Sequence, residues 1–214
     1  MRLDHVSYAA PAEHLADTVQ RIGSAVGASF VDGGIHPRFG TRNFVLPLAG
    51  GTYIEVVAAL DHPAAESAPF GRAVARRAAE GGGWLGWVVA VSDMGRVEAR
   101  FGRPAVPGHR IRPDGFDLTW RQLGILDTMA DPQLPYFVAW DVDPAHHPSA
   151  GGHDAVIAEL EIAGSPERIS AWLGEPANHP LDEVEVHWLD ESDPAGPGLV
   201  AVTLHTPRGP VRVD

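Results

Sequence analysis

The sequence predicts an α+β protein of mostly antiparallel sheet, made of repeated strand–helix–three-strand (βαβββ) units. Three observations support this prediction. Short segments that alternate apolar and polar residues, a pattern typical of half-buried strands, outnumber the helical segments. The 24 glycines and 19 prolines among 214 residues indicate many turns. The order of one strand, one amphipathic helix and several strands also recurs three times along the chain.

The first unit opens with a strand at about residues 3–9, followed by a helix whose first turn holds Pro11. The apolar residues of this helix recur at helical spacing, at Leu15, Val19, Ile22 and Val26. Further strands are expected at about 29–36, 42–48 and 52–58. A helical segment at about 66–80 then leads through Gly81-Gly82-Gly83 into the second unit.

The second unit begins with an apolar strand at 84–91. Ser92 or Asp93 can cap the helix that follows, which turns Met94, Val97 and Phe101 inward. The remaining strands of this unit are expected at about 106–112, 116–123 and 135–141.

The third unit follows a turn-rich segment at 143–152 and opens with a strand at about 155–162. Ser165 and Pro166 are typical of a helix start. Strands are then expected at about 183–189, 198–206 and 209–213. We therefore expect a paired domain over 1–148, with modules at about 1–62 and 83–142, and a C-terminal βαβββ-like unit over 149–214.

Composition excludes several classes of function. A net charge of −12 with scattered basic residues argues against nucleic-acid binding, which needs clustered Lys and Arg. The absence of cysteine excludes thiolate metal sites and Cys nucleophiles. No apolar run is long enough to span a bilayer, and the first residues do not resemble a signal peptide. We expect a cytoplasmic protein without a membrane partner.

His5 and Glu55 are the first candidates for a site. His5 lies in the opening strand with Leu3 and Ser7 on its face, and Glu55 lies in a later strand of the same unit. If the two strands share a sheet, the imidazole and the carboxylate converge on one concave surface. They then form either part of a metal or acid–base site, or a structural pair hydrogen-bonded to each other.

The segment from 36 to 43 is the richest in groups that can contact a ligand. His36 and Asn43 can reach the same cavity, and Arg38 or Arg42 can hold a carboxylate bidentately. Alternation also places Tyr53 and Trp87 on the cavity face, where Trp87 serves either as a stacking wall or as part of the core. The remaining histidines, including those at 146, 147, 153, 187 and 205, are interpreted as incidental or structural.

Five local motifs carry a resemblance to a known family. They are Leu3-Asp4-His5-Val6, the segment Gly34-Ile35-His36-Pro37-Arg38-Phe39-Gly40-Thr41-Arg42-Asn43, Leu46-Pro47-Leu48, Thr52-Tyr53-Ile54-Glu55-Val56-Val57, and Leu134-Pro135-Tyr136-Phe137-Val138-Ala139-Trp140-Asp141. In this order, over about 3–141, the chain resembles glyoxalase-like domain proteins of the vicinal oxygen chelate superfamily.

This resemblance implies that two modules pair and that their sheets curl around a cleft. It also implies a divalent metal held by residues on the first and last strand of each module. His5 and Glu55 match the ligand positions of the first module, whereas Trp87 and Ala139 stand at those of the second. Neither tryptophan nor alanine can bind a metal, so the resemblance implies an incomplete metal site.

Two functions remain open. One is a lyase or isomerase that binds a small oxygen-rich or carboxylate-bearing metabolite, with Glu55 or His36 shifting a proton next to a carbonyl. Its expected substrate contacts are Arg38, Thr41, Asn43, Tyr53 and Trp87. The alternative is a metal-free protein that binds or sequesters a drug or metabolite. Because an odd third unit leaves a face without a partner, we also expect a homodimer.

Overall fold

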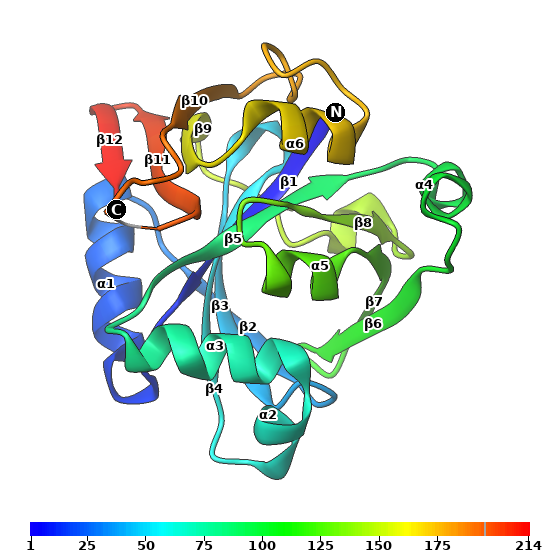
Figure 1. The fold of residues 1–214 in the computed structure, drawn as a ribbon. Helices are drawn as coiled ribbons and strands as arrows, with labels where there is room; N and C mark the ends of the chain where they lie inside the picture. The colour runs from blue at the N-terminus through cyan, green and yellow to red at the C-terminus, as the bar shows by residue number, and fades with distance from the viewer. Residues whose placement is uncertain (195) are drawn as a thin grey trace.

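The computed structural model describes residues 1–194 and 196–214 and contains two sheets (Figure 1). Eight strands close into a barrel in the order β1-β4-β3-β2-β6-β7-β8-β5. Four further strands form a separate sheet in the order β10-β9-β11-β12. None of the described helices is long and apolar enough to cross a membrane.

The barrel consists of two βαβββ modules with the same strand order. The first comprises β1 (Arg2–Ala9), α1 (Leu15–Val26), β2 (Val31–His36), β3 (Thr41–Pro47) and β4 (Tyr53–Ala59). The second comprises β5 (Gly83–Ala90), α4 (Met94–Phe101), β6 (Val106–Ile111), β7 (Asp117–Leu123) and β8 (Tyr136–Trp140). In each module the first strand pairs in parallel with the last, and the other pairs are antiparallel. The modules join through antiparallel pairs of β1 with β5 and of β2 with β6.

The predicted helix starts follow local chemistry. Asp93 and Ser165 accept hydrogen bonds from backbone N–H groups three residues further on and so cap α4 and α6 (Pro166–Leu173). The helix expected at 66–80 is instead two helices, α2 (Pro63–Ser67) and α3 (Pro69–Ala79). Pro69 separates them because the residue before a proline avoids the helical region, and Ala68 has a ψ of 133°.

The C-terminal unit has the predicted element order but not the strand order of the modules. It contains β9 (Val156–Ala163), α6, β10 (Glu185–Leu189), β11 (Gly198–Thr206) and β12 (Gly209–Val213). Here β9 pairs in parallel with the strand that follows its helix, β10, whereas β1 pairs in parallel with β4. The unit therefore has a topology of its own.

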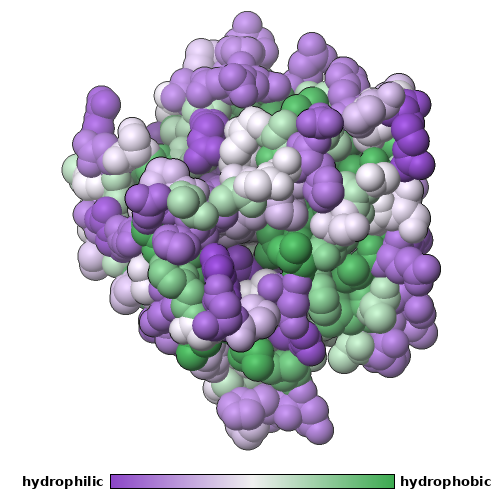
Figure 2. All heavy atoms as spheres, turned by 180° about the vertical axis from the view of Figure 1, so that it is seen from behind, coloured by the Kyte–Doolittle hydropathy of each residue, from purple (hydrophilic) through white to green (hydrophobic). Residues whose placement is uncertain are grey.

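One apolar core joins the outside of the barrel to the C-terminal sheet. Val6 and Trp84 from the barrel belong to the same buried cluster as Leu160 and Leu204 from the second sheet. The indole N–H of Trp84 also donates to the carbonyl of Val213 (3.1 Å). Figure 2 shows the opposite face of the molecule, where polar residues dominate and apolar residues form small patches. The polar side chains that form the candidate site lie inside the barrel.

Candidate functional site

The inside of the barrel holds a small, buried cavity with an aromatic and a polar side. The aromatic residues are Phe39, Tyr53, Phe70, Trp120, Tyr136 and Trp140. The polar residues are His5, His36, Asn43, Glu55, Arg110 and Gln122. The free volume of the cavity is small, about 30 Å³.

A β-bulge at Asp4 sets the direction of His5. The pairing of β1 with β5 shifts register between Leu3 and His5, which leaves Asp4 as an extra residue. Leu3 belongs to the core outside the barrel, whereas His5 lines the cavity. The expectation that Leu3 and His5 share a face is therefore wrong, because the bulge interrupts the alternation.

Asp4 is fully buried and holds His5 in place. The Nδ1 of His5 donates to Asp4 Oδ2 (2.7 Å), and Trp140 Nε1 donates to Asp4 Oδ1 (3.0 Å). His147, interpreted from sequence as incidental, donates to the same oxygen (3.3 Å). Burial opposes the negative charge, but the hydrogen bonds and charges of His147 and His5 outweigh it and hold the pKa of Asp4 well below its usual range. Asp4 is thus a carboxylate at neutral pH.

With Nδ1 engaged by Asp4, the other ring nitrogen of His5 faces the cavity. The Tyr136 hydroxyl lies 3.4 Å from His5 Nε2. The imidazole also stacks on the Tyr53 ring, with centroids 4.4 Å apart. Burial raises the pKa of both tyrosines well above the usual value, so both keep their hydroxyl proton.

Glu55 lies on β4 with both carboxylate oxygens hydrogen-bonded. Ser7 Oγ donates to Oε2 (2.7 Å), and Asn43 Nδ2 donates to Oε1 (2.6 Å). Burial opposes the charge of Glu55, but nearby His36 and His5 and these two hydrogen bonds outweigh it and lower its pKa. The hydrogen bond expected between His5 and Glu55 is replaced by these contacts. Each side chain lines the same cavity with different partners.

His36 lies beside Glu55, at the end of β2. Its Nε2 is 4.0 Å from Glu55 Oε1, and its Nδ1 shares a hydrogen bond with Thr41 Oγ1 (3.0 Å). Burial lowers the pKa of His36 to about 4, against the attraction of Glu55 and helped by the repulsion of Arg110. His36 is therefore neutral at pH 7, next to an ionised carboxylate.

The arginine in the cavity is not one of the two expected there. Arg38 is exposed and donates to the carbonyl of Pro107, and Arg42 pairs with Asp32 on the surface. Arg110 on β6 is buried in the cavity wall instead, where its Nη1 donates to Asn43 Oδ1 (2.8 Å). The only sign in the sequence that Arg110 faces the cavity was its position within an alternating strand.

Trp87 and Ala139 lie in the apolar core outside the cavity. The indole of Trp87 donates to the carbonyl of Gln133 (3.0 Å) rather than forming a cavity wall. The neighbouring Val88 packs with Trp120 and Val138, on the inner face. Since a shift of one residue exchanges the faces of a strand, the prediction for Trp87 was off by one position. Trp120 and Trp140 provide the aromatic walls.

These inward residues do not fit a divalent metal at His5 and Glu55. The second module contributes Val88, Tyr136 and Val138 near them, none of which is an imidazole or a carboxylate. Both oxygens of Glu55 already accept hydrogen bonds from neutral donors, and Nδ1 of His5 donates to Asp4.

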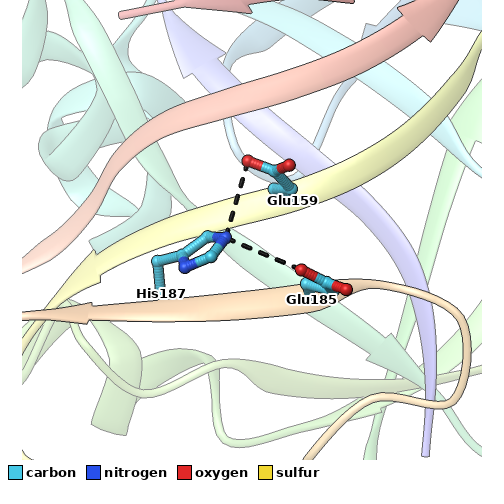
Figure 3. Close-up of side chains that lie close together, drawn as sticks. All are labelled: Glu159, Glu185 and His187. Atoms are coloured by element: carbon cyan, nitrogen blue, oxygen red, sulfur yellow. Dashed lines mark ion pairs between the residues drawn. The ribbon is translucent and has the colours of Figure 1, made fainter.

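A second group of ligand-type side chains lies on the C-terminal sheet. Within the described ranges, Glu159, Glu185 and His187 are the one set of three His, Asp or Glu residues whose ligand atoms lie within 4.8 Å of one another (Figure 3). His187 Nε2 is 3.5 Å from Glu159 and 3.8 Å from Glu185. These exposed ion pairs join β9 and β10, so His187 has a structural partner on each strand.

The geometry can now be compared with known proteins. The model of the glyoxalase-like domain matches residues 3–177, which is more than half of the chain. The chain belongs to the glyoxalase-like domain family. No curated protein matches it.

The chain is also similar to several solved structures. A hypothetical protein from Staphylococcus aureus is 15% identical with a TM-score of 0.61, covering 100% of this chain and 85% of its own. Methylmalonyl-CoA epimerase from Mycobacterium tuberculosis is 19% identical (TM-score 0.43; 65% of this chain, 86% of that one). A Streptomyces coelicolor methylmalonyl-CoA epimerase in complex with 2-nitronate-propionyl-CoA is 16% identical (TM-score 0.45; 66% and 99%). The first similarity covers the C-terminal sheet of this glyoxalase-like protein as well as its barrel.

Proposed function

We propose that this glyoxalase-like protein is a lyase or isomerase that moves a proton at a carbon next to a carbonyl of a small oxygen-rich metabolite. The observation that carries the proposal is the pair of Glu55 and His36, whose nearest side-chain atoms lie 4.0 Å apart inside one aromatic cavity. A carboxylate shielded from water is a competent base for a carbon acid.

Each polar wall residue then has a role. Glu55 takes the proton from the substrate carbon and becomes a neutral carboxylic acid. Neutral His36, 4.0 Å away, accepts that proton and returns it to the substrate, which restores the Glu55 carboxylate. Arg110 supplies positive charge for the enolate oxygen that develops. Asn43 and Tyr53 contact the substrate, and Thr41 orients His36 through their hydrogen bond. Arg38 and Trp87 have no part in this assignment.

Deuterium exchange tests the proposal without knowledge of the product. The protein is incubated in D₂O with a panel of 2-oxo acids, 2-oxo esters and aldehydes, and loss of the C–H signal is followed by proton NMR. Glu55→Gln should slow exchange by about 10²–10⁴-fold, the usual contribution of a positioned base. The exposed Glu66→Gln is the matched control. Exchange that proceeds equally in Glu55→Gln, or no exchange with any compound, contradicts the proposal.

A metal-free binding protein is the second candidate. It is favoured by the aromatic walls, since pockets for small molecules are mostly apolar with a few placed polar groups. This protein would hold a drug or metabolite unchanged. Saturable binding with no exchange in wild-type protein supports it over the enzyme.

A further inference from the structure

We infer that Arg110 is an anion-binding residue and that the ligand of the barrel cavity is a small carboxylate. The inference deepens the proposed function and rests on it for the identity of the site. The main observation is that the guanidinium of Arg110 is buried and that its Nε has no hydrogen-bond partner.

The Nε of Arg110 has no hydrogen-bond partner among the surrounding residues. Within the described residues, three buried side-chain nitrogens have no hydrogen-bond partner: the Nε atoms of Arg42, Arg77 and Arg110. Arg42 and Arg77 form ion pairs through their other nitrogens, with Asp32 and Glu80. Arg110 donates from Nη1 to the neutral amide of Asn43. It is the one of the three that lines the cavity.

Only 4% of Arg110 is exposed, so water cannot readily satisfy the charge. Burial lowers the pKa of Arg110, and Glu55 and Asp32 oppose this through their charge alone, without a hydrogen bond. An arginine stays protonated even so. A buried cation with an unused N–H is most simply satisfied by an anion, and the planar fork of arginine matches a carboxylate.

Gly33 in β2 has no side chain, which leaves room beside it for the guanidinium of Arg110 and the amide of Asn43. Gly33 lies in β2 at a register shift between Asp32 and Gly34. A Cβ on Gly33 would lie 2.4 Å from Arg110 Nη1 and 2.2 Å from Asn43 Oδ1. A side chain at this position would therefore displace both groups, which makes the glycine part of the binding geometry.

Asn43 sets the relation between the anion site and the base. Its Oδ1 accepts from Arg110 and its Nδ2 donates to Glu55, so one amide separates the guanidinium from the carboxylate. A ligand whose carboxylate meets Arg110 would present its second or third carbon toward Glu55. This order corresponds to a 2-hydroxy acid, whose acidic hydrogen is on C2, or to a 2-oxo acid, whose acidic hydrogen is on C3.

The cavity volume limits the size of the ligand. Because only about 30 Å³ is free, the acid must be small or must move covering side chains such as Phe70 of α3 and Ile125 of α5 (Ile125–Ala130). In Figure 1 these two helices run across the front of the barrel. The structure therefore assigns a short-chain 2-oxo or 2-hydroxy acid as the ligand class.

Fluorescence titration tests the inference, because Trp120 and Trp140 line the cavity. The probes are pyruvate, 2-oxobutyrate and lactate, each paired with its methyl ester. At least one acid should bind saturably and at least tenfold more tightly than its ester. If no acid binds, or if acids and esters bind alike, the inference is overturned.

Variants test whether Arg110 is the residue that binds the acid. Arg110→Met should weaken binding of that acid at least tenfold, and Arg110→Lys should retain part of it. The exposed Arg38→Met changes the net charge equally and should bind as wild type. Gly33→Ala keeps Arg110 in the sequence but should displace its guanidinium through the close contact, and so weaken binding. If Arg110→Met does not fold, as judged by circular dichroism, Arg110→Lys, Gly33→Ala and the ester comparison decide. Wild-type affinity in Arg110→Met overturns the inference.

Acid binding and proton exchange, each measured in wild type and in Glu55→Gln, distinguish a failure of this inference from a failure of the proposed function. Tight, Arg110-dependent binding of an acid without proton exchange leaves the anion site intact and removes the proposed chemistry. Exchange that depends on Glu55 but makes no distinction between acid and ester leaves the chemistry and removes the anion site.

Discussion

Asp4 decides what His5 can do in the cavity. A carboxylate on Nδ1 fixes the tautomer and orientation of an imidazole, which then presents Nε2 to the other side. Asp4 also receives donors from Trp140 and His147, so it connects β1, β8 and the segment after the barrel. An acidic residue inside an apolar strand was visible in the sequence, but the bulge that turns His5 inward was not.

His36 makes stability depend on pH in a definite direction. Its pKa is about 4 in the fold and 6.5 as the ordinary value, so the unfolded chain binds the proton first. The contribution of neutral His36 to the free energy of unfolding is complete above pH 6.5 and is lost as the pH falls toward 4. Between pH 7 and pH 5 the loss should be about 2 kcal/mol. Glu55 and Asp4, whose pKa values are lowered, add losses only at more acidic pH.

Urea unfolding at pH 7 and pH 5 measures this effect. His36→Gln keeps a polar side chain but cannot titrate, so its stability should change less between the two pH values. His14→Gln is the control, because His14 is exposed. Equal pH dependence in wild type and His36→Gln would show that His36 is not the group responsible.

At the scale of elements, α5 (Ile125–Ala130) was not predicted although it borders the cavity. The segment is short, and a helix of this length has little intrinsic stability, so packing decides whether it forms. It starts at Gly124, whose φ of +102° is accessible to glycine at low cost. Trp172 of α6 lies against this turn, which ties α5 to the C-terminal unit.

Gly124→Ala should therefore lower the free energy of unfolding by more than the strain of a positive φ alone explains. A Cβ at Gly124 would lie 3.1 Å from the Trp172 ring. Gly115 has a similar φ of +83° and nothing within 4 Å, which makes Gly115→Ala a matched control. We expect a loss of about 1 kcal/mol for Gly115→Ala and about 2–3 kcal/mol for Gly124→Ala in denaturant unfolding. Equal losses would mean that Trp172 moves aside freely.

At the scale of the whole molecule, the C-terminal sheet covers the barrel rather than presenting a free face. Met1 binds Asp182 through its amino group, and Arg208 donates to the carbonyl of Ser24 at the end of α1. Residues 49 and 155 are joined by a backbone hydrogen bond. The sheet face that was expected to need a second chain is buried within one chain, so the homodimer stays a prediction without that support.

This packing predicts one cooperative unfolding transition instead of two. Circular dichroism and tryptophan fluorescence should report the same midpoint in urea, since Trp120 and Trp140 report on the barrel and Trp172 and Trp188 on the C-terminal unit. A fragment ending at residue 148 should bind a hydrophobic dye, because Val6 and Trp84 lose their cover. Two separated transitions would instead support independent domains at 1–148 and 149–214.

The sequence alone predicted the order of most strands and helices and named polar candidates in the first module. Alternation, caps and turn residues allow this because they act over a few positions. The family resemblance, and not local pattern, implied the pairing of two βαβββ modules. His5, His36, Asn43, Tyr53 and Glu55 were candidates from the sequence and line the cavity, although His5 faces it because of the bulge at Asp4.

Only the tertiary structure decided the rest. Arg110 and Gln122 face the cavity because β6 and β7 close the barrel, and Trp87 faces away because of register. A bulge of one residue or a shift of one position changes which face a side chain occupies, and neither leaves a mark in the local sequence. Strand order in the C-terminal unit likewise depends on long-range packing, so the same sequence of elements formed a different sheet.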